Sequence, residues 1–158
     1  MDMLVALYRL PAAAPVVGEL LSKHGISIRA VYPFERTALR GFIERHFTTG
    51  WADEAEMGFR RLPASVLLAI HEKAIIGFAA YDCTFSGFFG PTGVDPAYRG
   101  KGVGTGLLLA SLERLRELGF AYGVIGSVGP AEFYVKAVGA QPIPDSTPGP
   151  YLNLLKRI

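Results

Sequence analysis

Glycines and basic residues gather in one stretch of the chain, Val94-Asp95-Pro96-Ala97-Tyr98-Arg99-Gly100-Lys101-Gly102-Val103-Gly104-Thr105. It follows an expected strand and opens the most regular helical pattern of the sequence, residues 105–118. The first N–H groups of a helix lack intrahelical partners, and the helix dipole adds partial positive charge there. The glycines leave the backbone open to a ligand, while Arg99 and Lys101 add formal charge. The stretch therefore predicts an anion site, best suited to a phosphate or pyrophosphate.

Two common phosphate-binding motifs do not describe this turn. No Gly-x-x-x-x-Gly-Lys-Ser/Thr loop occurs, and the spacing of Gly100, Gly102 and Gly104 differs from a dinucleotide-binding fingerprint. The alternative is a glycine-rich turn with solvated basic side chains. The position of the turn between a strand and a strong helix favours the anion site.

The same stretch resembles the acyl-CoA-binding motif of the GNAT superfamily of N-acetyltransferases. The motif of that family is Arg/Gln-x-x-Gly-x-Gly/Ala, which Arg99, Gly102 and Gly104 match. The order of expected elements over residues 26–151 is similar as well. The resemblance implies that acetyl-CoA is the cosubstrate, that N–H groups of the turn bind its pyrophosphate, and that its pantetheine arm lies beside a splayed strand. The implied cofactor-binding residues are Val94, Arg99, Gly100, Lys101, Gly102, Val103, Gly104 and Thr105.

A tyrosine follows in the segment Pro130-Ala131-Glu132-Phe133-Tyr134. GNAT proteins often carry a tyrosine in the corresponding helix, so the resemblance implies that Tyr134 is the general acid. A phenol with a pKa of about 10 stays protonated at neutral pH and can donate to a departing thiolate. The alternative is a core aromatic beside Phe133. The sequence departs from the common pattern here, because Gly129-Pro130 stands where many members have an asparagine.

The acceptor ammonium must lose a proton before it attacks, which calls for a base or a water molecule. Asp82 ends the second strand of an expected hairpin and is the first candidate. Glu35, Glu132 and His46 are the others. Three of the four have a structural alternative: a turn cap for Asp82, a helix-start charge for Glu35 and a packed core position for His46. By the resemblance, a backbone N–H near Gly93 or Val94 would stabilise the thioester oxygen.

Two further groups of residues have chemistry to offer. Cys83 could be a nucleophile, but no Cys-His-Asp grouping supports it and a small buried thiol is the simpler reading. Aromatic residues could line an acceptor pocket or simply fill the core; they are Trp51, Phe85, Phe88 and Phe89.

The elements that must position these residues follow from hydrophobic periodicity. Strands are expected at 4–10, 26–31, 66–70, 75–81, 85–94, 121–128 and 151–156, and helices at 15–24, 34–47, 53–62, 105–118 and 131–138. Pro91 predicts a bulge or a sheet edge. The alternation indicates one α/β (α+β) domain. By the resemblance, its central sheet is mixed, mostly antiparallel, covered by helices on both faces and splayed at the acyl-CoA site.

Composition limits the remaining classes. The 158 residues suit a single domain, in which 1–24 is an added strand and helix and 25–158 is the acetyltransferase core. Residues 1–24 would pack on the sheet edge or form a subunit contact. Half of the residues are apolar and 19% are charged, which excludes general disorder. The net charge of +2 argues against nucleic-acid binding.

Three further exclusions concern disulfides, metals and membranes. A single cysteine excludes an intrachain disulfide and a cysteine-rich zinc site, and the three histidines lack metal-ligand spacing. No apolar run is long enough to span a membrane, so a cytoplasmic location is the default expectation.

The residues alone predict an anion site at a helix start in an α/β domain. The resemblance to the GNAT superfamily implies an N-acetyltransferase that moves an acetyl group from acetyl-CoA to a primary amine by direct transfer. The expected partner is a small-molecule or peptide amine, with no nucleic acid, membrane or metal; a homodimer is compatible with the sequence. A non-catalytic acyl-CoA-binding or sensing module of the same fold is the first alternative. An interaction protein with a vestigial pocket is the second.

Overall fold

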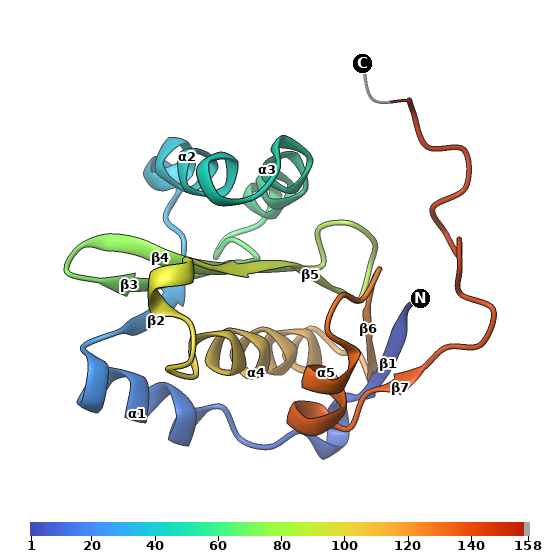
Figure 1. The fold of residues 1–158 in the computed structure, drawn as a ribbon, viewed down its shortest axis with the longest axis horizontal. Coiled ribbons are helices and arrows are strands. Elements are labelled where there is room, and N and C mark those ends of the chain that lie inside the picture. Colours follow the sequence, from blue (N-terminus) through green and yellow to red (C-terminus); the bar gives the residue numbers. More distant parts are fainter. Residues whose placement is uncertain (157–158) are drawn as a thin grey trace.

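The computed structural model describes residues 1–156, whose strands form one seven-stranded sheet in the order β2-β3-β4-β5-β6-β1-β7 (Figure 1). All neighbouring strands are antiparallel except β5 and β6, which are parallel. The predicted fold class is thereby confirmed. The strands are β1 (Met3–Ala6), β2 (Ser27–Ala30), β3 (Val66–His71), β4 (Ala74–Tyr81), β5 (Phe88–Val94), β6 (Tyr122–Ile125) and β7 (Gln141–Pro142).

Helices cover both faces of the sheet. The pair α2 and α3 lies on one face, while α4 packs on the other face with α1 outside it (Figure 1). Two buried clusters result, one on each side of the sheet. The helices are α1 (Ala14–His24), α2 (Arg36–His46), α3 (Thr49–Glu56), α4 (Val103–Glu117) and α5 (Ala131–Val138), with short 3-10 turns at Leu7–Arg9, Pro33–Glu35, Met57–Arg60 and Pro96–Tyr98.

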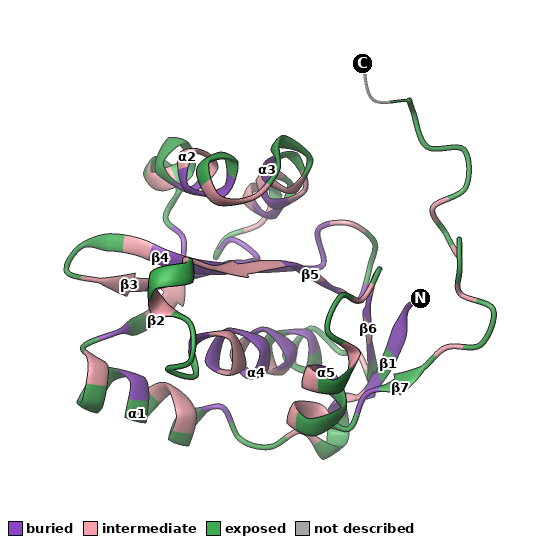
Figure 2. Ribbon diagram, viewed as in Figure 1, coloured by how far each residue is buried: buried purple, intermediate pink, exposed green. Residues whose placement is uncertain are grey.

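Helix α4 supplies much of the buried cluster on its face of the sheet. Its leucines at 107, 108, 112 and 115 are fully buried. Each such side chain contributes about 1.5–3 kcal/mol relative to an exposed one. Figure 2 shows this helix largely buried, whereas α1 and α5 carry exposed faces. The start of α4 is therefore held firmly against the sheet.

The N-terminal strand does not lie on the edge of the sheet, which was one of the two expectations for residues 1–24. Strand β1 lies inside the sheet, where Met3 pairs with Ile125 on one side and with Pro142 on the other. It is therefore not an edge strand. The strand is also shorter than the expected 4–10, because residues Leu7–Arg9 turn into a 3-10 helix. Helix α1 then packs against α4, and Gly25 in a left-handed conformation ends it as predicted.

The expected strand at 151–156 is wrong. These residues form a turn and an extended segment without a sheet partner (Figure 1). The place beside β6 is taken by β1, and three prolines between 144 and 150 remove backbone donors from the approach. The pairing on the other side of β1 is made by Gln141–Pro142. Tyr151 instead packs edge-on against Phe85, with ring centroids 6.1 Å apart.

The second early helix also begins earlier than predicted. Periodicity indicated 53–62, but α3 covers Thr49–Glu56 and a 3-10 turn follows. The Thr48 side chain accepts a hydrogen bond from the Trp51 N–H at 3.1 Å and caps the helix. Trp51 and Glu54 consequently lie one turn apart on the same helix face. The remaining elements agree with the predictions to within a few residues.

Candidate functional site

The glycine-rich turn is built by a short chain of local contacts. The Asp95 carboxylate accepts the Ala97 N–H at 2.9 Å, and the 3-10 turn Pro96–Tyr98 follows. The Tyr98 hydroxyl lies 3.0 Å from His71 Nδ1 at the end of β3. Gly100 and Gly102 then adopt φ angles of +81° and +90°, which L side chains rarely tolerate. These two left-handed conformations turn the chain so that α4 begins at Val103, directly after Gly102.

The start of α4 presents free N–H groups to a hollow of about 530 Å³. The first N–H groups of a helix lack intrahelical acceptors, and they carry the positive end of the dipole. A Cβ added at Gly100 or Gly102 would meet nothing within 4 Å, so the approach is open. Arg99 lines the hollow, whereas Lys101 lies outside its lining. The predicted residues Val94, Gly100, Gly102, Val103, Gly104 and Thr105 all line it.

A cleft between β5 and β6 continues from this hollow. Within residues 1–156 the two strands pair only at Phe88–Val124 and Phe89–Ile125, and β5 then runs on to Val94 without a neighbouring strand on that side. The β4–β5 register shifts between Ala79 and Tyr81, which is the irregularity that Pro91 predicts. The opening measures about 340 Å³ and is mostly apolar. It shares with the hollow the residues Val94, Gly104, Pro130 and Phe133.

The Val94 N–H is a backbone donor that faces this cleft. The Asp95 N–H bonds to the Ile76 carbonyl of β4 at 2.9 Å. Alternate residues of a strand direct their N–H groups to opposite edges, so the Val94 N–H points away from β4. That edge of β5 has no strand partner beyond Phe89, and Val94 lines the cleft. A donor is thus available for an oxygen atom in the gap.

Tyr134 is a buried residue in the wall of the cleft. Its side chain is only 7% exposed and packs edge-on against Phe89 and Phe133, with centroids 6.4 and 5.0 Å away. It lines the cleft together with Phe89 and Gly104. Burial raises the pKa of the Tyr134 phenol above its ordinary value, so the hydroxyl keeps its proton through neutral pH. The geometry suits a proton donor to a group in the cleft.

The structure does not bring Asp82 to this cleft. Asp82 is buried with φ +55° in the loop after β4. One carboxylate oxygen accepts the Gly87 N–H at 2.7 Å, and the other pairs with the Arg61 guanidinium. Its backbone carbonyl accepts from Arg60 at 2.7 Å. These contacts fix the loop, and Asp82 does not line the cleft.

The other base candidates also lie away from the lining. Glu35 is held by both terminal nitrogens of Arg29 at 2.6 and 2.9 Å, and this pairing lowers its pKa. His46 packs on Phe42 and lies 3.9 Å from Asp95. Glu132 stands in the first turn of α5. None of these three side chains lines the cleft.

Cys83 has the surroundings of a structural thiol. It is 5% exposed, and its Sγ lies 3.5 Å from the Ser65 hydroxyl and 3.3 Å from the Tyr81 carbonyl. Burial raises the pKa of the Cys83 thiol, which disfavours the thiolate that a nucleophile needs. Cys83 therefore has the surroundings of a small buried thiol of the core, as its simpler interpretation predicted.

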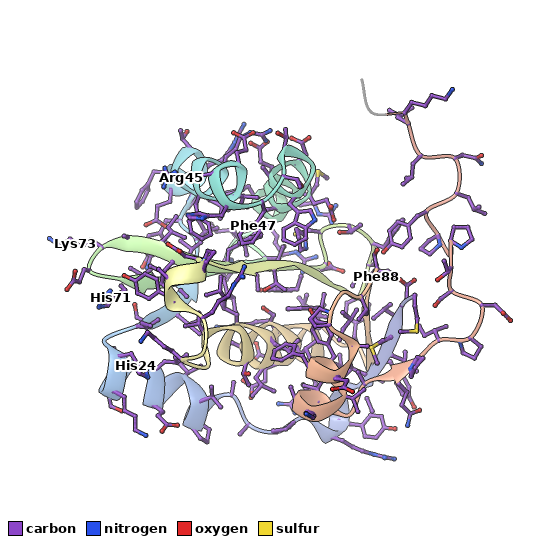
Figure 3. The ribbon with its side chains drawn as sticks, viewed as in Figure 1. His24, Arg45, Phe47, His71, Lys73 and Phe88 are labelled. Atoms are coloured by element: carbon purple, nitrogen blue, oxygen red, sulfur yellow. The ribbon has the colours of Figure 1, made fainter. Side chains whose placement is uncertain are left out.

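A second hollow adjoins the cleft on the side of α3. It encloses about 540 Å³ and contains all four aromatic residues proposed from the sequence for an acceptor pocket: Trp51, Phe85, Phe88 and Phe89. Glu54, Thr84 and Tyr151 line it too, and the sequence analysis missed them. Figure 3 shows Phe47 between the α2–α3 layer and the sheet, and Phe88 near the junction of β5 and β6. The i, i+3 spacing of Trp51 and Glu54 could have indicated that both residues lie on one helix face. The predicted helix began at residue 53, after Trp51, and therefore did not contain this pair.

A comparison with protein families identifies the family of this chain. The model of the acetyltransferase (GNAT) family matches residues 29–139. The chain belongs to the GNAT family. Among curated proteins no match was found.

Solved structures support the GNAT fold at low identity. A glucosamine N-acetyltransferase region of a fungal multi-domain GH3 β-N-acetylglucosaminidase superposes with a TM-score of 0.70 at 15% identity, over 89% of this chain and 19% of that one. GNAT proteins from Sphaerobacter thermophilus and Kribbella flavida give TM-scores of 0.68 and 0.62 at 21% and 19% identity. Each match covers 89% of this chain and 47% or 53% of the other, so this chain spans about half the length of those structures.

Within residues 1–156 no helix is long and apolar enough to cross a membrane. The same residues contain no group of three or more His, Cys, Asp or Glu side chains arranged to hold a metal ion.

Proposed function

We propose that the protein is an N-acetyltransferase that moves the acetyl group of acetyl-CoA to a primary amine by direct transfer. The observation that carries the proposal is the separation of β5 from β6 beyond Phe89, which opens an apolar cleft directly onto the start of α4. An apolar slot that ends at an anion site fits a long thiol arm attached to a pyrophosphate.

The residues present fit such a cosubstrate. The N–H groups at the start of α4 and the Arg99 guanidinium would hold the pyrophosphate. The unpaired edge of β5 from Gly90 to Val94 would hold the pantetheine arm. When bound, acetyl-CoA supplies an acetyl thioester. The turn binds its phosphates, and the cleft walls exclude water from the thioester end.

The remaining roles concern charge and protons. The acceptor nitrogen forms a bond to the acetyl carbon, the carbon–sulfur bond breaks, and the products are the amide, free CoA thiol and one proton from the ammonium. The Val94 N–H is placed to stabilise negative charge on the acetyl oxygen. Tyr134 donates a proton to the departing sulfur. Because none of the four carboxylate and histidine candidates lines the cleft, the ammonium proton leaves through water.

The first experiment measures cosubstrate binding by thermal shift and calorimetry. At a hundred times its Kd a ligand stabilises by about 2.7 kcal/mol, which raises the Tm of a domain of this size by about 5–11 °C. We expect this shift with acetyl-CoA and CoA and little shift with ATP. Arg99→Ala should weaken binding about tenfold, or 1.4 kcal/mol. Arg45→Ala, an exposed arginine on α2, is the matched control (Figure 3).

The outcomes separate the alternatives. No shift at high concentration of either CoA species contradicts the proposal and favours the interaction protein. Tight binding of acetyl-CoA without acetylation of any amine favours the sensing module. In that case Tyr134→Phe should also leave the binding of acetyl-CoA unchanged. Release of CoA thiol that depends on an amine supports the enzyme.

A further inference from the structure

The aromatic hollow beside α3, defined above by Trp51, Phe85, Phe88, Phe89, Glu54, Thr84 and Tyr151, is a direct extension of the cleft. The two openings share a wall that includes Trp51, Phe89, Gly90 and Ser127. The anion site lies beyond the opposite end of the cleft, at the start of α4. A group in the hollow therefore approaches the thioester end from the side away from the phosphates.

Aromatic rings supply most of its wall. Phe85 packs edge-on against Phe88 with centroids 5.2 Å apart and against Tyr151 at 6.1 Å. Trp51 stacks on Phe47 with ring centroids 5.2 Å apart, and this contact holds the indole ring in position. Phe85 is 42% exposed, so the rings are accessible at the mouth. Such a surface favours a flat apolar or aromatic group over a hydrated chain.

Charge in the hollow has one sign. Of its described lining residues, only Glu54 carries a formal charge at neutral pH. The Thr84 hydroxyl donates to Oε2 of Glu54 and orients the carboxylate. Burial and the neighbouring carboxylates of Asp2 and Glu54 raise the pKa of Tyr151 to about 12. A cation entering this hollow meets a carboxylate and no competing guanidinium or ammonium in the lining.

We infer that the aromatic hollow binds the acceptor, that the acceptor is a primary amine attached to an aromatic or similarly apolar group, and that Glu54 binds its ammonium. The inference rests on the proposed function for the transfer step. Aromatic faces add cation–π attraction for the same ammonium. Polyamines would leave further charges among the rings, and free amino acids would bring a carboxylate toward Glu54. Both classes are disfavoured by desolvation or repulsion.

Acceptor binding can be measured without any transfer. Trp51 is the only tryptophan of the chain, so its fluorescence reports on the hollow directly. The probes are phenethylamine and 2-phenylethanol, which share the ring but differ in the charged group. We expect phenethylamine to bind at least tenfold more tightly. Glu54→Gln should remove this preference, while Asp53→Asn should keep it, because Asp53 on the same helix pairs with Arg40 at 2.7 Å.

Transfer is then measured with acetyl-CoA and a panel of phenethylamine, spermidine and glycine. We expect kcat/KM for phenethylamine to exceed the other two at least tenfold in the wild type. Equal binding of the two probes, a preference that survives in Glu54→Gln, or faster acetylation of spermidine or glycine would overturn the inference. Selective binding of phenethylamine without product, despite bound acetyl-CoA, would instead refute the transfer and leave the amine site standing.

Discussion

Replacing Tyr134 by phenylalanine removes one oxygen atom from the wall of the cleft and leaves the packing intact. The ring is buried between Phe89 and Phe133, and both edge-on contacts are made by carbon atoms that phenylalanine retains. We therefore expect the free energy of unfolding to change by less than about 1 kcal/mol. Truncation to alanine would instead cost about 3–5 kcal/mol, because it would empty the same space.

The expected loss of activity follows from the proton that the hydroxyl supplies. General acid catalysis contributes about 10²- to 10⁴-fold. A thiolate whose parent thiol has a pKa of about 8.5 leaves more readily than an alkoxide, so the lower end applies. We expect kcat of Tyr134→Phe to fall about 10²-fold, or 2.7 kcal/mol, with KM for acetyl-CoA within about twofold.

The assay follows the CoA thiol with a disulfide reagent. Cys83 adds little background, because it is buried and its thiol pKa is raised. Burial also raises the pKa of Tyr134, and the acid must be protonated to act. Any alkaline decline in wild-type kcat caused by Tyr134 should therefore lie above the ordinary phenol pKa, and it should be missing in Tyr134→Phe. Tyr122→Phe, on an exposed tyrosine outside the cleft, is the control. A kcat for Tyr134→Phe within threefold of wild type would refute the assignment.

Three further substitutions test the framework of the site. Gly93→Ala places a Cβ 2.3 Å from the Phe47 ring; we expect a loss of about 1–3 kcal/mol in urea unfolding and a changed Trp fluorescence spectrum. Asp82→Asn should lower stability by about 1–3 kcal/mol and kcat less than threefold, whereas a catalytic base would lose far more activity. Tyr98→Phe removes the contact with His71 and should raise KM for acetyl-CoA about two- to fivefold at unchanged kcat.

The parts of the site that the sequence predicted are those made by neighbouring residues. The anion site needs only a strand end, glycines that accept positive φ and the first turn of a helix, all within residues 94–105. The local pattern therefore contains both the conformation and the chemistry. Pro91 likewise marks the irregularity of β5, because a missing N–H affects its own strand directly.

The parts that the sequence did not predict depend on distant residues. The expected strand at 151–156 has a suitable pattern, but β1 occupies the place beside β6. Asp82 has the residue type of a base, yet Arg61 and Gly87 engage its carboxylate. Glu54 gains its position from a helix start that Thr48 determines and from Thr84, thirty residues later. Periodicity within one element cannot show which partner a side chain meets in another.

The central position of β1 determines how late this strand can pair during synthesis of the chain. Its partners on either side, β6 and β7, are made roughly 120 and 140 residues later, which at about 5–20 residues per second takes about 6–24 s and about 7–28 s. During that interval the residues of β1 lack the two strands with which they pair, so their backbone groups stay unpaired and their apolar side chains stay exposed. Strand β1 thus reaches its native contacts only after both of these later strands have been made. A chaperone that holds nascent chains would therefore have to protect β1 until β6 and β7 are made.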